Sequence, residues 1–292
     1  MQIGRVSEVW MYPVKSMAGH TVDTVQLDEL GVIGDRSWSM LESNGDVAWG
    51  KRFPKLMNLE ARYVSERPQT RMFAEHVPPV SVRFPDGSEV GSDGLIDSQV
   101  SAYVGESLSL SALQPPENRE HYRWAQPLDE EAIMKILGIA PGEALPDLSE
   151  YPEELILLLA ECFAPPGTYN DMAPIHLLTT ASLAHMSELS GESFDSRRFR
   201  PNFLVDTNED ISGLAEFSWI GRRLRIGGAE LEVAAKTIRC SMPARPQLPF
   251  DLEANPKIAK ALYEETNRFM GAYLSIVKPG AVSAGDEVVL LP

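Results

Sequence analysis

The chain has 292 residues, of which 43% are hydrophobic and 23% charged, and its formal net charge is −16 at pH 7. At roughly 150 residues per domain, this length predicts about two domains. So acidic a chain repels phosphate backbones and anionic lipid headgroups, and we expect neither nucleic acid nor a membrane as a partner. No apolar run reaches about 18 residues, and the start MQIGRVSEVW lacks the pattern of an export signal. Its two cysteines, Cys162 and Cys240, are too few for a disulfide framework, so we expect a cytoplasmic protein.

The first part of the chain has the alternating pattern of β-strands. Asn44-Gly45 and Asp86-Gly87 are strong signals for tight hairpin turns between strands. The stretch DSQVSAYVGE predicts a short helix that ends at Gly105. We expect an antiparallel arrangement with strands or hairpins over 5–14, 21–27, 37–51 and 81–90.

An acidic segment follows at residues 126–161. It contains nine acidic residues and one base, Lys135, so it contributes −9 + 1 = −8 of the net −16. The stretches LDEEAIMKILG and SEYPEELILLLAE each predict a helix, the first ending at Gly138 and the second with acids in its first turn, where the helix dipole favours them. A solvated linker and an acidic docking surface both remain open as interpretations.

Downstream of this segment, helices and strands alternate. A helix is predicted over 181–189, and Asn255-Pro256 is typical of a helix start. We expect that second helix to continue to about Phe269 and to end at Gly271. Strand-like patterns cover 203–207, 223–233 and 287–292.

Two short N-terminal stretches combine cations with tight-turn residues. In YPVKSM, Lys15 and Ser16 follow directly on a strand and Pro13, which suits a phosphate or an oxyanion. An exposed lysine in a turn is the alternative. In GVIGDRSW, Arg36 can direct two N–H donors at an anion, or form an ion pair with Asp35 or Asp28.

Two later stretches have similar features. In DMAPIHLLTTASL, the hydroxyls of Thr179, Thr180 and Ser182 lie at a helix start, where free N–H groups bind anions or are simply capped. His176 in that stretch lies among apolar residues, so we expect a buried core histidine. In RRFRPNFLVD, Arg200 and Asn202 flank Pro201 at a strand entry, which by itself is typical of a surface turn.

Cys240 follows a strand-like run and has Arg239 as its neighbour. A neighbouring cation favours the thiolate, which is the form that attacks carbon or binds a soft metal. A small buried apolar residue is the alternative. For Cys162, in the apolar run LLLAECFA, we expect the buried role.

Taken in order, YPVKSM, GDRSW, APIHLLTTASL, RFRPNF, WIGRRLRIGGAELEV, IRC and PGAVSAGDEVVLL resemble the MOSC family over most of the chain. The resemblance is to members with both an N-terminal β-barrel domain and a MOSC domain, among them the amidoxime-reducing component and its bacterial relatives. It implies an α+β, β-rich fold with an N-terminal β-barrel-like domain over 1–125, an acidic helical connector over 126–161 and a MOSC β-barrel domain with peripheral helices over 162–292.

The resemblance also implies a molybdenum cofactor (Mo-molybdopterin) with Cys240 as the metal ligand and catalytic residue. Where relatives have a second cysteine three positions earlier, this chain has Thr237. By the same resemblance, the cofactor's phosphate and pterin would be held by Lys15, Ser16, Arg36, Thr180, Ser182, Arg200 and Asn202, with Arg239 and Ser241 beside the metal.

The activity implied is reduction of small N-hydroxylated compounds: amidoximes, hydroxylamines and N-hydroxylated bases. No cysteine follows Cys240, so we expect no iron–sulfur domain after it and expect the electrons to come from a separate flavin, haem or iron–sulfur protein. Two alternatives remain. The chain could be a non-catalytic cofactor carrier or sulfur-transfer protein that uses Cys240, or an anion-binding module without a metal.

Overall fold

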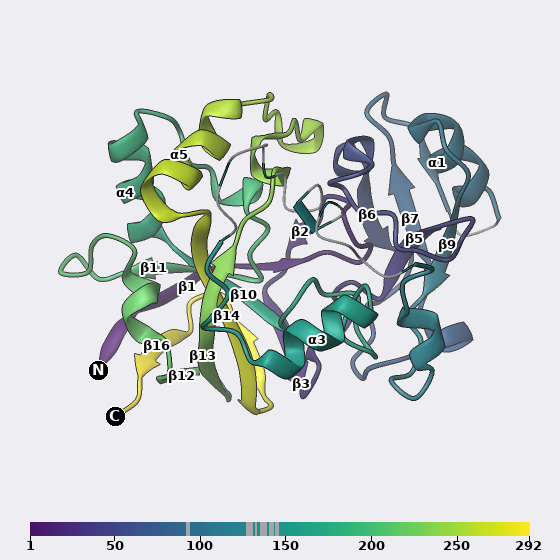
Figure 1. Ribbon diagram of the computed structural model, residues 1–292. Helices are drawn as coiled ribbons and strands as arrows, with labels where there is room; N and C mark the ends of the chain where they lie inside the picture. Colours follow the sequence, from purple (N-terminus) through teal and green to yellow (C-terminus); the bar gives the residue numbers. More distant parts are fainter. Residues whose placement is uncertain (92–93, 127–130, 132, 135–138, 140–142, 144–145) are drawn as a thin grey trace.

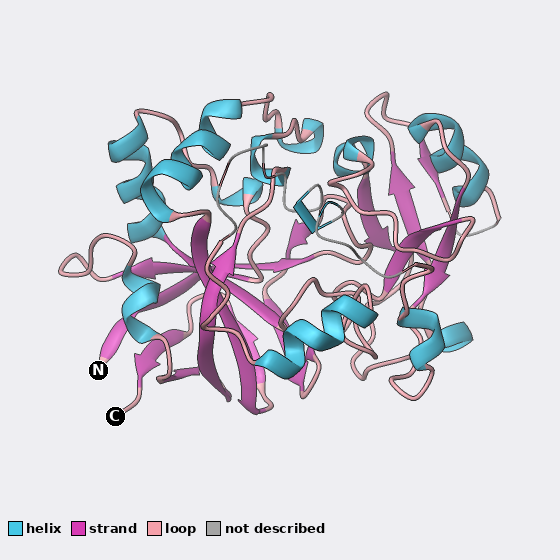
Figure 2. Ribbon diagram, in the orientation of Figure 1, coloured by secondary structure: helices cyan, strands magenta, loops and turns pink. Residues whose placement is uncertain are grey.

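The computed structural model describes residues 1–91, 94–126, 131, 133–134, 139, 143 and 146–292. Two lobes lie side by side: a strand-rich barrel flanked by two helices, and a smaller lobe of short sheets (Figures 1 and 2). The predicted α+β, β-rich class is confirmed. No helix in the described ranges is long and apolar enough to cross a membrane.

The barrel is closed by seven strands in the order β11-β10-β14-β13-β12-β16-β1, with β11 also paired to β1. In β13 alternate residues are buried, which is the pattern of a strand with one face on a core. Those residues, with the inward faces of the other strands, form the largest apolar core. The strands are β1 (Gln2–Met11), β10 (Ile175–Thr179), β11 (Phe203–Thr207), β12 (Arg223–Ile226), β13 (Ala229–Ile238), β14 (Phe269–Lys278) and β16 (Glu287–Leu290).

Strand β1 comes from the N-terminal segment but lies between two strands of the C-terminal barrel. Val6 is opposite Val205 of β11, and Arg5 is opposite Glu287 of β16. The division at 1–125, 126–161 and 162–292 stays a prediction, and the barrel takes one of its strands from the first of these ranges.

The smaller lobe surrounds a second apolar core. Its sheets are β5 (Trp38–Glu42) with β9 (Leu108–Ala112), and β6 (Glu60–Tyr63) with β7 (Val80–Arg83) and β8 (Glu89–Val90). Helix α1 (Ile96–Val104) ends at Gly105, as predicted. Other short pairings involve β2 (His20–Thr21), β3 (Thr24–Asp28), β4 (Gly31–Val32) and β15 (Ala281–Ser283). Short 3-10 helices cover Pro54–Asn58, Ala74–His76, Arg119–Tyr122, Ser196–Arg198, Ala215–Trp219, Met242–Ala244 and Leu248–Phe250.

Both predicted hairpin turns form, but only one joins two strands. Gly87 has φ +86° between β7 and β8, as the Asp86-Gly87 signal indicated. At Asn44-Gly45 the chain turns, and Leu41 makes a single antiparallel bridge with Val47. The main partner of β5 is the distant β9, because the residues after the turn leave the sheet.

Of the two helices predicted in the C-terminal part, both begin as expected, but the second ends earlier than predicted. Helix α4 (Thr180–Ser190) covers the expected range, and α5 (Pro256–Thr266) begins after its cap Asn255. The expected continuation of α5 to Phe269 is wrong: the helix ends at Asn267, which takes a left-handed conformation. Gly271 lies inside β14 with φ +84°, where a Cβ atom would approach His176 Nε2 to 2.3 Å.

The acidic segment contributes helix α3 (Glu153–Glu161), as predicted. The other helix, expected to end at Gly138, falls largely outside the described residues. Among the described acids of this segment, Glu150 pairs with Lys236 at 2.6 Å and Glu161 with Arg123 at 3.1 Å. Glu150 and Glu161 therefore contact residues outside the acidic segment, and the solvated-linker interpretation of 126–161 stays a prediction.

Candidate functional site

A cavity of about 260 Å³ is lined by residues of both lobes and of the acidic segment. Its polar side contains five cations, Lys15, Arg36, Lys51, Arg200 and Arg239, which we call the cationic wall. Asp171 is the one carboxylate among the lining residues that the structure describes. The cavity therefore has the opposite charge to the chain as a whole, which is the property of an anion-binding site.

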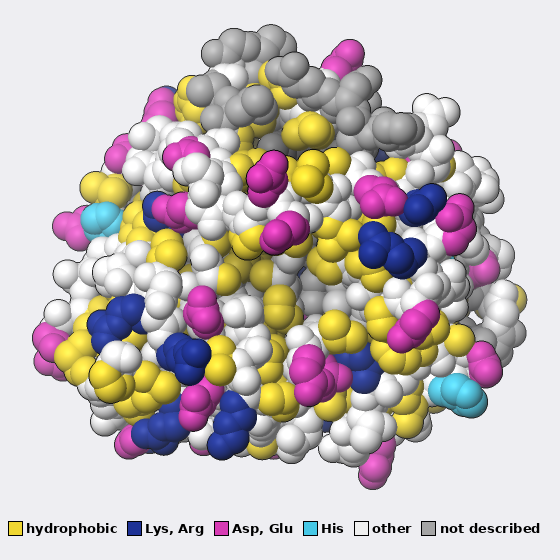
Figure 3. Space-filling view, turned by 60° about the horizontal axis from the view of Figure 1, so that its bottom comes forward, with side chains coloured by type: hydrophobic (Ala, Val, Ile, Leu, Met, Phe, Trp, Pro, Cys, Tyr) yellow, Lys and Arg dark blue, Asp and Glu magenta, His cyan; other side chains and the backbone are white. Residues whose placement is uncertain are grey.

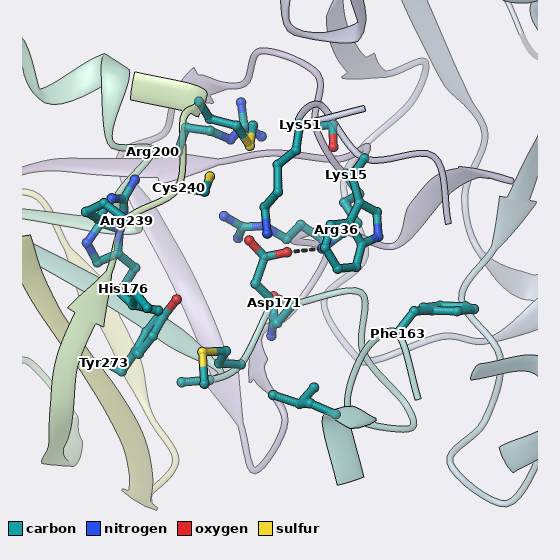
Figure 4. A pocket seen from close by; sticks show the side chains of 18 of the residues that line it. Lys15, Arg36, Lys51, Phe163, Asp171, His176, Arg200, Arg239, Cys240 and Tyr273 are labelled. Atoms are coloured by element: carbon teal, nitrogen blue, oxygen red, sulfur yellow. Dashed lines mark hydrogen bonds and ion pairs between the residues drawn. The ribbon is translucent and has the colours of Figure 1, made fainter. Parts of the chain in front are cut away.

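Cys240 lies beside this wall, directly after β13, with its sulfur near the side chains of Arg200 and Arg239 (Figure 4). It is partly buried and free, so its thiol is accessible from the cavity. Ser241 is not among the lining residues; its carbonyl accepts a hydrogen bond from Ala244 N in the short helix that follows.

Three residues of the predicted site have left-handed backbone conformations. The φ angles are +69° at Ser16, +46° at Arg36 and +56° at Arg200. Such conformations are costly outside glycine and concentrate at functional sites, where surrounding contacts hold them. At Ser16 one such contact is the hydrogen bond that Gly50 N donates to its hydroxyl at 2.9 Å.

A buried carboxylate joins the loops that carry the predicted residues. Asp35 accepts hydrogen bonds from Tyr12 N at 2.7 Å and from Asn202 Nδ2 at 3.1 Å, and it forms an ion pair with Arg36. The ion pair left open for Arg36 therefore exists, and the residue lines the cavity as well. Asn202 also accepts a bond from His176 N at 3.1 Å. This network fixes Arg36 and Asn202 relative to each other across the two lobes.

Lys15 is buried and points at the cavity from the end of the first strand. Its Nζ donates to Asp171 Oδ1 at 2.5 Å and to Tyr169 O at 2.7 Å. Burial lowers the pKa of Lys15, and the attraction of Asp171 opposes that shift. Burial would raise the pKa of Asp171, but Lys15 and Lys51 outweigh it and lower that pKa. The structure thus keeps a tight ion pair at the cavity surface.

Arg200 and Arg239, which lie near Cys240, each have a buried nitrogen without a hydrogen-bond partner among the described residues. The Arg200 guanidinium lies over the Tyr12 ring at 4.3 Å, and its Nη2 is buried without a hydrogen-bond partner in the described structure. Arg239 Nη2 donates to Phe199 O at 2.8 Å, while its Nε likewise has no partner there. Burial lowers the pKa of Arg200 to about 10, so the group stays charged at neutral pH. Unpaired buried donors are costly unless a ligand accepts from them.

The structure does not bring Thr180 and Ser182 into the cavity. Thr180 Oγ1 donates to Asp206 at 3.1 Å, and Ser182 Oγ donates to the buried Glu216 at 2.5 Å. Thr179 caps the helix and also bonds Glu216. Carboxylates already occupy the start of α4 and would repel a phosphate, so only the capping interpretation of this helix is supported.

His176 is buried, as expected, and it also lines the cavity. Burial and the nearby Arg239 hold its pKa well below the usual range, so the ring is neutral at pH 7. Its Nε2 has no hydrogen-bond partner within the described residues. Cys162 is fully buried, as expected, at the apolar end of the same cavity.

The opposite side of the cavity, which we call the apolar wall, is largely hydrophobic. The sequence analysis did not predict this wall, because its residues are scattered along the chain and carry no reactive group. It also did not predict that Lys51, Asp171 and Tyr273 line the cavity. Only Asp171 had a signal, since it begins the stretch DMAPIHLL. The apolar wall comprises Trp49, Trp124, Leu148, Ile156, Leu159, Ala160, Phe163, Met172 and Ala173.

The described residues contain no group of three His, Cys, Asp or Glu side chains placed to hold a metal. A metal at Cys240 would therefore need most of its ligands from a cofactor rather than from protein side chains. The cationic wall offers the charges that an anionic cofactor needs.

Comparison with known proteins agrees with this geometry. Residues 3–106 match the MOSC N-terminal beta barrel domain and residues 165–289 match the MOSC domain. The chain is 24% identical to mitochondrial amidoxime reducing component 2 of Rattus norvegicus, over 98% of this chain and 83% of the relative. It is 24% identical to mitochondrial amidoxime-reducing component 1 of Homo sapiens, over 99% and 84%.

Among solved structures, the YUAD protein from Bacillus subtilis aligns over 98% of this chain and 94% of its own, at 13% identity and a TM-score of 0.43. YiiM from Escherichia coli aligns over 44% and 59%, at 19% identity and a TM-score of 0.30. The two domain matches cover both the N-terminal and the C-terminal parts of the cavity and support association with the molybdenum cofactor. The chain belongs to the MOSC family and carries both its N-terminal beta barrel domain and its MOSC domain.

Proposed function

We propose that this protein is a molybdenum-cofactor-dependent reductase of N-hydroxylated compounds. The observation that carries the proposal is the placement of the accessible Cys240 thiol beside five cavity-lining cations. The names of the relatives, which are amidoxime-reducing components, support the choice of substrate.

The residues present fit such a cofactor. Molybdopterin carries a phosphate, and Lys15, Arg36 and Arg200 supply a point charge and two forked donors for it. The unpartnered Nη2 of Arg200 and Nε of Arg239 are buried donors that an anionic ligand would satisfy. Cys240 supplies the soft thiolate that molybdenum accepts.

When bound, the cofactor supplies the two-electron chemistry that breaks the N–O bond. The protein binds, orients and controls access. The cations would hold the anionic part of the cofactor, Asp35 keeps Arg36 in place through its ion pair, and Cys240 would be the protein's ligand to the metal. The apolar wall would limit the access of water to that side of the cavity. We further propose that a separate donor protein delivers the electrons.

The experiment compares the purified protein with Cys240→Ala and the matched control Cys162→Ala. We expect stoichiometric molybdenum, a thiolate-to-metal absorption band and reduction of benzamidoxime in the wild type and in Cys162→Ala. Cys240→Ala should keep its melting temperature, lose the band and lose reduction by at least about a thousandfold, because removing a partly exposed thiol leaves little cavity but deletes the proposed metal ligand.

Other outcomes would contradict the proposal. Equal reduction by the two variants would show that Cys240 is not the ligand. Labile sulfur on Cys240 without reduction would indicate a sulfur-transfer protein, and absence of molybdenum after expression in a cofactor-competent host would indicate a plain anion-binding module.

A further inference from the structure

Helix α3 of the acidic segment contributes three residues to the apolar wall. Ile156, Leu159 and Ala160 of this helix line the cavity. The helix has the sequence EELILLLAE, yet none of its residues is fully buried. A helix this apolar is normally covered by protein. Its partly exposed side chains therefore face a space that a ligand can fill.

This helix is held firmly in place over the cavity. Leu155 and Ile156 pack against the cluster that includes Tyr151 and Tyr273, and Leu158 packs against the cluster around Cys162. The Tyr151 hydroxyl bonds Lys236 O on β13. In Figure 1, α3 lies at the lower centre, between the two lobes. The helix thus packs against two apolar clusters, one beside β13 and β14 and one around Cys162, and forms a fixed wall.

Aromatic rings continue the apolar wall at the C-terminal end of α3. Trp124 Nε1 donates to Leu159 O at 3.1 Å, and the Trp124 and Trp49 rings lie 5.2 Å apart. Phe163 follows, 6.0 Å from Trp124. Flat rings next to aliphatic side chains favour planar, apolar groups. On the face shown in Figure 3, hydrophobic side chains gather around a central hollow with acidic side chains near its rim.

We propose that the apolar wall is the substrate subsite and that Ile156 and Leu159 set its specificity. This inference rests on the proposed function. The preferred substrates are uncharged N-hydroxylated compounds with an aryl or similarly flat apolar group, such as arylamidoximes. A charged compound gains no ion pair from this wall, because none of its side chains is charged. A small polar compound gains little from the wall.

The test compares benzamidoxime with acetamidoxime, which has a methyl group in place of the ring. The variants are Leu159→Ser, Ile156→Ser and the control Leu157→Ser, whose side chain on the same helix is 62% exposed and does not line the cavity. For benzamidoxime we expect KM to rise about tenfold in the first two variants while kcat changes less than about twofold. Acetamidoxime should be unaffected throughout, and the control should match the wild type for both substrates.

A second variant, Leu159→Trp, narrows the subsite without exposing a polar group. It should raise the KM of benzamidoxime more than that of acetamidoxime. Equal effects on both substrates, or no effect of any variant at position 156 or 159, would overturn the inference.

Binding measured separately distinguishes the inference from the proposed function. Calorimetry with the cofactor-loaded protein and benzamidoxime, without a reductant, reports the subsite alone. If benzamidoxime binds with an affinity that depends on Leu159 but is not turned over, the proposed reductase activity is refuted and the proposed subsite is supported. Turnover of both compounds with wild-type KM values in every variant would keep the reductase and refute the subsite.

Discussion

The two walls of the cavity are built in different ways. The cationic wall comes from short stretches at the ends of strands, with strained backbones at Ser16, Arg36 and Arg200 and a buried carboxylate, Asp35, behind them. The apolar wall comes from three residues of α3 and from aromatic and aliphatic residues of other segments, none of which has a positive φ. The difference teaches that the placement of the cations is fixed by local chain geometry, whereas the shape of the neighbouring space is set by how separate segments pack.

The largest effect is expected on the cationic wall. Arg200→Ala removes a buried charged donor, which is worth about 1.5–3 kcal/mol to an anion, so cofactor content after dialysis should fall about tenfold or more. Arg197→Ala is the matched control, because Arg197 is paired with Asp195 and does not line the cavity. Released pterin is measured by fluorescence after oxidation. Equal retention by both variants would remove Arg200 from the site.

The pH dependence of cofactor retention sharpens this prediction. Burial lowers the pKa of Arg200 to about 10, so its charge is lost as pH rises through that value. Retention by the wild type should therefore weaken as the pH approaches 10, with Arg200→Ala showing less of this loss. Identical profiles would assign the effect to another group.

A smaller effect is expected at His176, which lines the cavity near Arg239. Its pKa is lowered from the ordinary value of 6.5, chiefly by burial and then by Arg239. The unfolded chain therefore binds a proton that the folded chain excludes, and stability falls as pH drops below about 6.5. The slope is at most about 1.4 kcal/mol per pH unit. The free energy of unfolding, measured with urea between pH 7 and pH 5, should fall less steeply with decreasing pH in His176→Gln than in the wild type. An unchanged slope would mean that the His176 ring is protonated in the folded protein.

The smallest effect is expected at the rim of the apolar wall. Glu153 and Glu154 are exposed at the start of α3 and have no ion pair in the described structure, whereas Glu150 is paired with Lys236. Glu153→Gln with Glu154→Gln should change the rate with a charged electron donor about twofold at low salt, in a direction set by the donor's charge, and the change should fade near 0.1 M salt. Glu150→Gln serves as the comparison. A salt slope equal to that of the wild type with every donor would show that this rim takes no part in docking.

Much of the cationic wall could be predicted because its signals are local. Lys15, Arg36 and Arg200 each stand next to proline, glycine or a strand end, and all three line the cavity. Thr180 and Ser182 had an equally local signal, but in the fold the start of this helix lies beside Glu216 and not in the cavity. A helix N-terminus in sequence cannot reveal which carboxylates will lie beside it.

Other parts of the fold depend on contacts that a linear pattern does not contain. Strand β10, with five buried residues in a row, lacks the alternation that marks a half-exposed strand. Strand β14 begins three residues after α5, and the left-handed Asn267 that separates them was overlooked in favour of Gly271. The acids of 126–161 suggested solvent exposure, while Ile156, Leu159 and Ala160 of α3, which lie among them in the sequence, line the cavity.

The position of β1 has a consequence for how the protein acquires its structure. Because the strand at 2–11 is bonded to partners at 203–207 and 287–290, the barrel cannot close until nearly the whole chain has left the ribosome. Contacts between residues so far apart carry a large loop-closure entropy, which slows folding. A fragment that begins after β1 would leave β11 and β16 with free edges, and such edges pair readily with other chains. The barrel half should therefore aggregate when it is produced without its first strand, and should recover when that strand is supplied as a separate peptide.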